Sequence, residues 1–280
     1  MHTSNRERVK KGKRKERERM VQRYDERVQI LVYVDDILIT GSNPKTVTDI
    51  ITHLHNTFSL KDLGELKYFL GIEVTKNSNG LVLTQSKYAK DLLHRADMQD
   101  ANPIATPMIS GQKLSAHGSE HFADPQMYRS IVGALQYLTI TRPELSYSVN
   151  KVCQFMQKPL QSHWLAVKRI LRYVAGTLQH GLHLTKSSSL ELTAYCDADW
   201  ASDIDDRRST SGFAVFLGQN LITWKSQKQH TISRSSTEAE YRSLANVVAE
   251  IAWLQSLFSE LHIHYFLKLP MFYNFFTRMP

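Results

Sequence analysis

At 280 residues the chain can hold about two modest domains, each with its own hydrophobic core. An apolar content of 42% sets it apart from disordered chains, and no run of about 18 uncharged apolar residues predicts a membrane span. The opening residues lack the apolar core of a secretion signal. The two cysteines, Cys153 and Cys196, are too few for a zinc site or a disulfide framework. We therefore expect an intracellular protein, in the cytoplasm or nucleus, with two small buried thiols.

The net charge of +8 is concentrated at the start of the chain. Residues 1–28 contain 11 Lys and Arg against 5 Asp and Glu, a surplus of +6, which leaves +2 for all the other residues. A basic arm of this kind suits binding to nucleic-acid phosphates or nuclear import. The alternative, which we favour, is a solvated charged segment that is partly helical or disordered.

Two adjacent carboxylates, Asp35 and Asp36, lie within the apolar run ILVYVDDILIT at residues 30–40. The β-branched and aliphatic flanks predict two short strands. Burying ionised carboxylates is costly unless a cation or a donor offsets the charge. A tight turn at the Asp-Asp step avoids this cost, because the apolar residues pack while at least one acid points to where a divalent metal can meet it. A hairpin tip with solvated acids is the alternative that spacing alone leaves open.

The next expected elements are a helix, a hairpin and a second helix. Helical spacing predicts a helix over residues 45–58. Residues 68–75 and 81–84 predict the two strands of a β-hairpin, and residues 85–96 predict a short helix. The first helix has one apolar stripe, formed by Val47, Ile50, Ile51, Leu54 and Phe58.

Residues 99–123 are polar and punctuated by Pro and Gly, which predicts a linker. A helical block follows it. We expect three helices here: one that begins at Pro125 behind the cap Asp124, one over residues 143–156, and one behind the cap Ser162.

From residue 190 the pattern changes to alternation of apolar and polar residues, which predicts strands. Residues 190–197, 213–217 and 221–225 are the expected strands, and residues 230–233 are a candidate for a fourth. A long helix then runs over about residues 237–261. Its expected core-facing stripe is formed by Leu244, Val248, Ile251, Leu254 and Leu257.

Several long blocks of the sequence carry a family resemblance. One set comprises YVDD followed by ILITGSN, LKDLGELKYFLGIEV and LTQSKYAKDLLHRADM. A second set comprises YRSIVGALQYLTITRPELSYSVN, HWLAVKRILRYVAGT, LTAYCDADWASD and RSSTEAEYRSL. In this order they resemble the second half of the reverse transcriptase palm, the connection and the ribonuclease H parts of the Pol polyprotein of copia-type LTR retrotransposons. The resemblance runs over about residues 30–263, and residues 1–28 do not share it.

The resemblance implies an α+β fold: a partial reverse transcriptase palm plus a helical connection and a truncated ribonuclease H-like mixed sheet with one long helix. The ancestral role is RNA-directed DNA synthesis and cleavage of RNA–DNA hybrids. The implied domains are a basic arm (1–28), a partial palm (29–98), a linker (99–123), a helical connection (124–188), a truncated ribonuclease H-like domain (189–264) and a divergent apolar tail (265–280).

The resemblance also implies catalytic and metal-binding roles for four acids: Asp35, Asp36, Asp197 and Glu240. Two divalent ions about 3.5–4 Å apart, held by clustered Asp and Glu, support phosphodiester chemistry. Mg²⁺ prefers carboxylate oxygen and is the implied cofactor. Other acids are expected to serve elsewhere, Glu238 and Asp199 facing solvent, and Asp203, Asp205 and Asp206 in turns and surface pairs.

Each implied site lacks members. The family's third polymerase acid lies on an earlier strand, and its later ribonuclease H acids follow the long helix, whereas Glu260 is the last acid of this chain. We therefore expect a truncated fragment with little or no catalysis of its own. One alternative is a module that binds an RNA–DNA hybrid or single-stranded nucleic acid through Lys225, Lys228 and Arg234. The other is a gene-model product without function.

Overall fold

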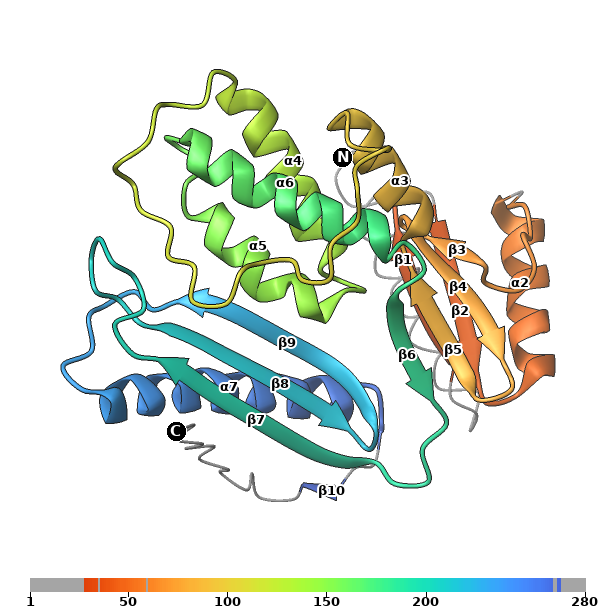
Figure 1. The fold of residues 1–280 in the computed structure, drawn as a ribbon. Coiled ribbons are helices and arrows are strands. Elements are labelled where there is room, and N and C mark those ends of the chain that lie inside the picture. Colours follow the sequence, from red (N-terminus) through yellow and green to blue (C-terminus); the bar gives the residue numbers. More distant parts are fainter. Residues whose placement is uncertain (1–27, 35, 59, 264–265, 268–280) are drawn as a thin grey trace, which may run out of the picture. The chain divides into compact units, whose positions relative to one another are not determined.

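The computed structural model describes residues 28–34, 36–58, 60–263 and 266–267, and it divides into two compact units, Met1–Leu66 and Lys67–Pro280 (Figure 1). Asp35, residues 1–27 of the expected arm and residues 268–280 of the expected tail lie outside the described residues. Helices combine with mainly antiparallel sheets, so the α+β class is confirmed. No helix in the described part of the chain has both the length and the apolar character to cross a bilayer.

The first unit contains the expected hairpin and helix. Strands β1 (Val28–Tyr33) and β2 (Asp36–Gly41) pair antiparallel, with Tyr33 opposite Asp36. Helix α2 (Pro44–Phe58) follows, and the Asn43 Oδ1 accepts a 2.9 Å hydrogen bond from the Lys45 N–H at its start. The predicted stripe of α2 is only half-buried, and Phe58 is exposed, because a two-stranded hairpin offers too little surface to cover it.

The second unit begins with a four-stranded antiparallel sheet, one strand of which the sequence did not reveal. In sheet order its strands are β3 (Tyr68–Phe69), β4 (Ile72–Asn77), β5 (Gly80–Thr84) and β6 (Gly181–Thr185). The first three form the predicted hairpin region. Strand β6 arrives from about a hundred residues later in the chain and completes the sheet.

Two glycines make the β5–β6 pairing possible. Gly80 and Gly181 lie at opposite ends of the register, facing Thr185 and Thr84. A Cβ atom would come within 2.0 Å of a backbone oxygen at Gly80 and within 2.2 Å of one at Gly181. No side chain fits at either position, so the strands approach each other only because both residues are glycine.

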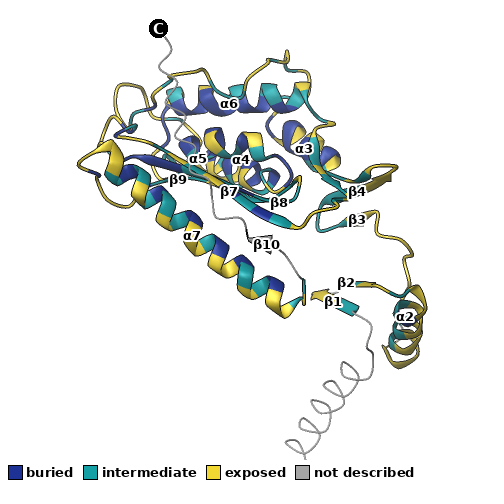
Figure 2. Ribbon diagram, turned by 90° about the horizontal axis from the view of Figure 1, so that it is seen from below, coloured by how far each residue is buried: buried dark blue, intermediate teal, exposed yellow. Residues whose placement is uncertain are grey.

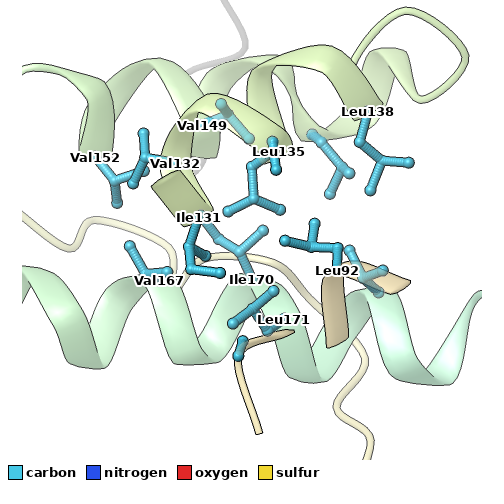
Figure 3. Packing of buried hydrophobic residues seen from close by; sticks show 14 of the residues in the cluster. Leu92, Ile131, Val132, Leu135, Leu138, Val149, Val152, Val167, Ile170 and Leu171 are labelled. Atoms are coloured by element: carbon cyan, nitrogen blue, oxygen red, sulfur yellow. The ribbon is translucent and has the colours of Figure 1, made fainter. Parts of the chain in front are cut away.

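Helices α3 (Ser86–Arg95), α4 (Pro125–Leu138), α5 (Ser146–Cys153) and α6 (Gln161–Gly176) enclose the larger hydrophobic core. Figure 3 shows aliphatic side chains from these helices meeting at its centre. The apolar stripe predicted for α4 is largely buried, since Ile131, Leu135 and Leu138 are at most 1% exposed. Asp124 caps α4 as predicted, accepting a 2.8 Å hydrogen bond from the Met127 N–H.

The other two helices of this block begin differently from the prediction. Pro143 starts a single 3-10 turn, η1 (Pro143–Leu145), before α5. Ser162 is not the cap of α6, which begins at Gln161. The ring of His163 folds back instead, and its Nδ1 accepts a 3.0 Å hydrogen bond from the Leu160 N–H. A side chain of the first turn therefore accepts from the backbone N–H of the residue before the helix, and Ser162 does not cap α6.

The third sheet has the order β10–β7–β8–β9. It contains β7 (Glu191–Asp199), β8 (Thr210–Leu217) and β9 (Asn220–Lys228), all antiparallel, and β10 (Phe266–Leu267), which is parallel to β7. Helix α7 (Ser236–Glu260) packs on one face of this sheet, against β7 and β8. Figure 2 shows α4, α5 and α6 on the opposite side.

Two predictions in this region are wrong. Residues 230–233 form no strand, and irregular chain leads there from β9 to α7. Val248 is 51% exposed, so it does not belong to the buried stripe of α7. That stripe consists of Ala239, Ser243, Val247, Ile251, Leu254 and Phe258. Small residues at its start bring the helix close to the sheet, and a stripe chosen by hydrophobicity alone misses them.

Candidate metal site at the end of strand β7

Strand β7, strand β9 and the start of α7 meet at one end of the third sheet (Figure 1). Asp199, at the end of β7, faces Thr210, which in turn faces Lys228 at the end of β9. The Trp200 indole N–H donates a 2.9 Å hydrogen bond to the Ser233 carbonyl, which ties the chain after β7 to the chain before α7. Acids that are far apart in sequence are therefore brought to one edge.

Asp197 and Glu240 lie side by side at this edge. Their carboxyl groups share a hydrogen bond, and the Ala198 backbone N–H also donates to Glu240. Burial raises the pKa of Glu240 above its ordinary value, and the Asp197 carboxylate raises it further. The repulsion between two neighbouring carboxylates is relieved when a proton or a cation lies between them.

The start of α7 is anchored so that Glu240 reaches this edge. The Ser235 Oγ accepts a 3.1 Å hydrogen bond from the Glu238 N–H and caps the helix. One turn beyond Glu240, the buried Ser243 Oγ donates to the Asp197 carbonyl at 2.8 Å. The cap fixes the helix start, and the Ser243 bond holds the helix to β7 one turn beyond Glu240.

Glu238 is part of the helix start and not of the acid pair. It accepts a 2.8 Å hydrogen bond from the Arg234 N–H and forms a 2.7 Å ion pair with Arg242. The Arg234 N–H and the Arg242 guanidinium lower the pKa of Glu238 below its ordinary value. Its side chain thus stabilises the helix start, at the partly exposed position expected for it.

Asp199 is exposed, and its charge acts on two residues of α5, Tyr147 and Lys151. Burial, and then the Asp199 charge, raise the pKa of Tyr147. Lys151 is buried, with 9% exposure, and its Nζ donates to the Thr210 Oγ1 at 3.3 Å. Burial lowers the pKa of Lys151, while the charges of Asp203 and Asp199 oppose that shift.

Lys228 forms an internal ion pair. Its Nζ lies 2.6 Å from the Asp203 Oδ2 and 2.8 Å from the Asp206 Oδ2. Asp203 is 7% exposed, and although burial opposes the shift, the hydrogen bond from Lys228 and two backbone N–H groups lower its pKa. Of the three residues predicted to bind nucleic acid, Lys225 and Arg234 are exposed.

The remaining loop acid, Asp205, is tied to the linker. Its carboxylate accepts hydrogen bonds of 2.6 Å from the Ser115 Oγ and 2.7 Å from the Ala116 N–H. Turn and pairing roles were expected for the acids of this loop, and these contacts agree with that expectation.

The donor set at the edge of β7 suits a hard cation. Carboxylate oxygens are the ligands that Mg²⁺ prefers, and one or two protein acids can hold this ion with water completing its shell. Over the described residues, however, no group of three or more His, Cys, Asp or Glu side chains is placed to hold a metal. Asp197 and Glu240 therefore fit one weakly held ion. At the other predicted site, Asp36 is exposed at the start of β2, and Asp35 lies outside the described residues.

Sequence patterns did not single out Lys151 and Ser243 as parts of this edge. Both are polar residues that occupy buried positions of a helix, Lys151 between Val149 and Val152, and Ser243 between Ala239 and Val247. Such an interruption of an apolar stripe is the signal that could have identified them.

Comparison with known proteins agrees with the family resemblance. Residues 8–110 match the family model described as reverse transcriptase (RNA-dependent DNA polymerase). This match extends into residues 8–28, where we expected no resemblance. No solved structure matches the chain.

Three relatives illustrate the similarity. The chain is 51% identical over 244 residues to the retrovirus-related Pol polyprotein from transposon RE1 of Arabidopsis thaliana, covering 87% of this chain but 17% of that polyprotein. It is 51% identical to an uncharacterized mitochondrial protein of the same plant, over 80% of this chain and 93% of that protein. It is 34% identical to the putative transposon Ty5-1 protein of Saccharomyces cerevisiae, over 80% of this chain and 74% of that protein. The chain belongs to the Pol polyprotein family of copia-type retrotransposons and is a fragment of its reverse transcriptase region.

Proposed function

We propose that the edge of the third sheet is a divalent-metal site descended from a ribonuclease H centre, in which Asp197 and Glu240 hold one Mg²⁺. The observation that carries this proposal is the hydrogen-bonded pair of carboxyl groups and the raised pKa of Glu240 that accompanies it. Burial is the larger cause of this shift, and a cation between the two groups would offset the part that comes from the Asp197 charge.

The proposal includes the division of the chain. Residues 189–264 are the truncated ribonuclease H-like part, 124–188 the connection and 29–98 the partial palm, with a basic arm before them, a linker at 99–123 and an apolar tail from 265. Support for the ribonuclease H-like part comes from three antiparallel strands followed by one long helix, and Phe266 and Leu267 at the start of the tail add a strand parallel to the first of these strands. Asp35 and Asp36 are, in this division, the paired acids of the polymerase centre.

The chemistry that follows is phosphodiester chemistry on an RNA–DNA hybrid. A bound divalent ion neutralises charge on the attacked phosphate and lowers the pKa of a bound water. Asp197 and Glu240 would supply its protein ligands, and Ser243 holds the Asp197 backbone in place. Because only two acids converge among the described residues, we propose that this chain alone turns over a hybrid slowly or not at all.

The test uses Mn²⁺ as a probe for the divalent ion, with the bound fraction measured by electron paramagnetic resonance. We expect weak binding of one ion to the intact chain and a clear loss in both Asp197→Asn and Glu240→Gln. Glu260→Gln is the matched control, because Glu260 is exposed at the far end of the same helix. Equal Mn²⁺ binding by all four proteins would disprove the site. Rapid Mg²⁺-dependent hybrid cleavage that Asp197→Asn abolishes would disprove the weak-catalysis part alone.

A second candidate function is nucleic-acid binding without catalysis. The exposed Lys225 and Arg234 support it, whereas Lys228 is engaged with Asp203 and Asp206. Affinity for a hybrid should then fall with salt, and each phosphate contact contributes about 0.9 to the slope of log K against log salt. Substituting Lys225 by Gln should lower that slope by about one. No binding even at low salt would eliminate this candidate.

A further inference from the structure

Trp200 is a large aromatic side chain that the fold leaves half-exposed. It follows Asp199 directly, at the end of β7, and 49% of its surface is accessible. Its one polar atom is already satisfied, since the indole N–H donates to the Ser233 carbonyl at 2.9 Å. The other ring atoms are carbon, so the part of the ring that is exposed to solvent is apolar.

The group that orients Trp200 is itself fixed. Ser233 is 3% exposed, and its Oγ donates a 2.8 Å hydrogen bond to the Gln229 Oε1. Gln229 is also buried, and its Nε2 donates to the Ala239 carbonyl at 2.9 Å. The ring is thus anchored through this chain of hydrogen bonds to the start of α7, and its orientation is set before any ligand arrives.

The neighbours of the anchor extend the surface. Ile232, next to Ser233 in the chain, is 57% exposed, and Arg234 on the other side is exposed as well. An exposed tryptophan together with an aliphatic and a guanidinium group is a combination that suits single-stranded nucleic acid, where bases stack on aromatic rings and cations meet the phosphates.

Trp200 lies close in sequence to Asp197, which forms the acid pair with Glu240. Asp197 precedes Trp200 by three residues in the chain. Ala198, whose backbone N–H donates to Glu240, precedes Trp200 by two residues. We propose that Trp200 is a stacking platform for an unpaired nucleobase of the strand whose phosphate approaches the acid pair. This inference rests on the proposed function, since the acids repel phosphate unless a divalent cation is bound between them. Stacking at Trp200 is therefore expected only in the presence of Mg²⁺.

The test measures the affinity of the full chain for a labelled deoxythymidine strand of about twelve nucleotides, by fluorescence anisotropy in Mg²⁺. Trp200→Ala should weaken binding about 5- to 150-fold, the range expected for the loss of one stacked base. Trp200→Phe keeps an aromatic face and should retain most of the affinity. Trp253→Ala is the matched control, because Trp253 is 56% exposed on α7 and should leave the affinity unchanged.

Two further measurements separate stacking from a general loss of structure. Oligonucleotide binding should quench tryptophan fluorescence in the parent chain but much less in Trp200→Phe. An abasic strand of the same length should bind the parent chain and Trp200→Ala equally, because it has phosphates but no bases.

The outcomes are distinct. If the parent chain binds and Trp200→Ala binds equally well, the stacking proposal is wrong while the proposed function stands. If Trp200→Ala weakens binding to the abasic strand as much as to the deoxythymidine strand, the ring contacts the backbone and base stacking is likewise excluded. If the parent chain binds no nucleic acid in Mg²⁺ at low salt, the stacking proposal is wrong, whereas the divalent-metal site falls only if the Mn²⁺ measurement shows no loss in Asp197→Asn and Glu240→Gln.

Discussion

His163 should make the helical core sensitive to mild acid. Its side chain is fully buried, and its Nδ1 accepts from the Leu160 N–H while its Nε2 lies 2.9 Å from the Ser115 carbonyl. Because Nδ1 must be unprotonated to accept, the hydrogen is on Nε2 and is donated to Ser115. The ring is neutral and stacks on Phe155, with 3.7 Å between centroids.

Protonation would place a second N–H against the Leu160 N–H in a buried site. Burial accordingly lowers the pKa of His163 below its ordinary value of 6.5, although the Ser115 carbonyl and the Asp205 charge oppose the shift. A base with a lowered pKa in the folded state binds fewer protons there than when unfolded, so folding stability is complete above about pH 6.5 and falls as the pH drops further. One such group can remove at most about 1.3 kcal/mol between about pH 7 and about pH 5.5.

The variant that tests this is His163→Asn, whose side-chain oxygen can still accept from Leu160 but does not titrate in this range. The free energy of unfolding of the parent chain minus that of the variant should decrease on going from neutral to mildly acidic pH. His180→Asn, at an exposed position, is the control for the other histidines and should show no such change. The protection factor of the Leu160 amide against hydrogen exchange, which is the intrinsic rate at each pH divided by the observed rate, should fall in acid in the parent chain and not in His163→Asn. A pH-independent difference between parent and variant would refute the reasoning.

Three further changes have calculable outcomes. Asp124→Ala removes the cap that accepts from Met127 and should lower stability by about 1 kcal/mol, measured by urea unfolding with far-ultraviolet circular dichroism. Gly181→Ala would place a Cβ atom 2.2 Å from the Leu83 carbonyl. This clash should lower the free energy of unfolding by about 1–3 kcal/mol and speed hydrogen exchange in β6, while the helix content is retained. Lys228→Met leaves the buried Asp203 without its cation. Because Lys228 is itself 22% exposed, the free energy of unfolding should fall by about 1–3 kcal/mol, less than for a fully buried pair. The thermal midpoint should be lower in this variant, and adding Asp203→Asn should partly restore it.

Local signals in the sequence were sufficient wherever structure depends on neighbouring residues. The Asp124–Pro125 start of α4 follows from capping, and the β1–β2 hairpin around the YVDD motif follows from its β-branched and aliphatic flanks. Strand β6 could not be predicted in this way, because its strand conformation depends on pairing with β5, about a hundred residues earlier. The pairing depends on two glycines, and a glycine in a short apolar segment indicates a turn as readily as a close strand approach.

Side chains whose hydrogen-bond or ion-pair partners lie far away in the sequence were also not predicted. Ser162 is a good capping residue by type, yet the structure uses the ring of His163, because that ring also reaches the Ser115 carbonyl. Lys228 was predicted to bind nucleic acid, and the sequence did not reveal its ion pairs with Asp203 and Asp206. Its position opposite Asp203 is set by the register of β9 with β8, which the sequence does not specify to one residue.

The distribution of internal cations distinguishes the acid pair from the other acids of the same edge. Asp203 and Asp206 lie in the adjoining loop, and both are neutralised by Lys228 at under 3 Å. Among the described residues no Lys or Arg forms an ion pair with Asp197 or Glu240. A chain selected for stability alone would gain from a basic side chain between two such carboxylates. The fold instead neutralises the loop acids with its own cation and gives the Asp197–Glu240 pair no basic partner among the described residues, and this difference supports the divalent-metal site that we propose.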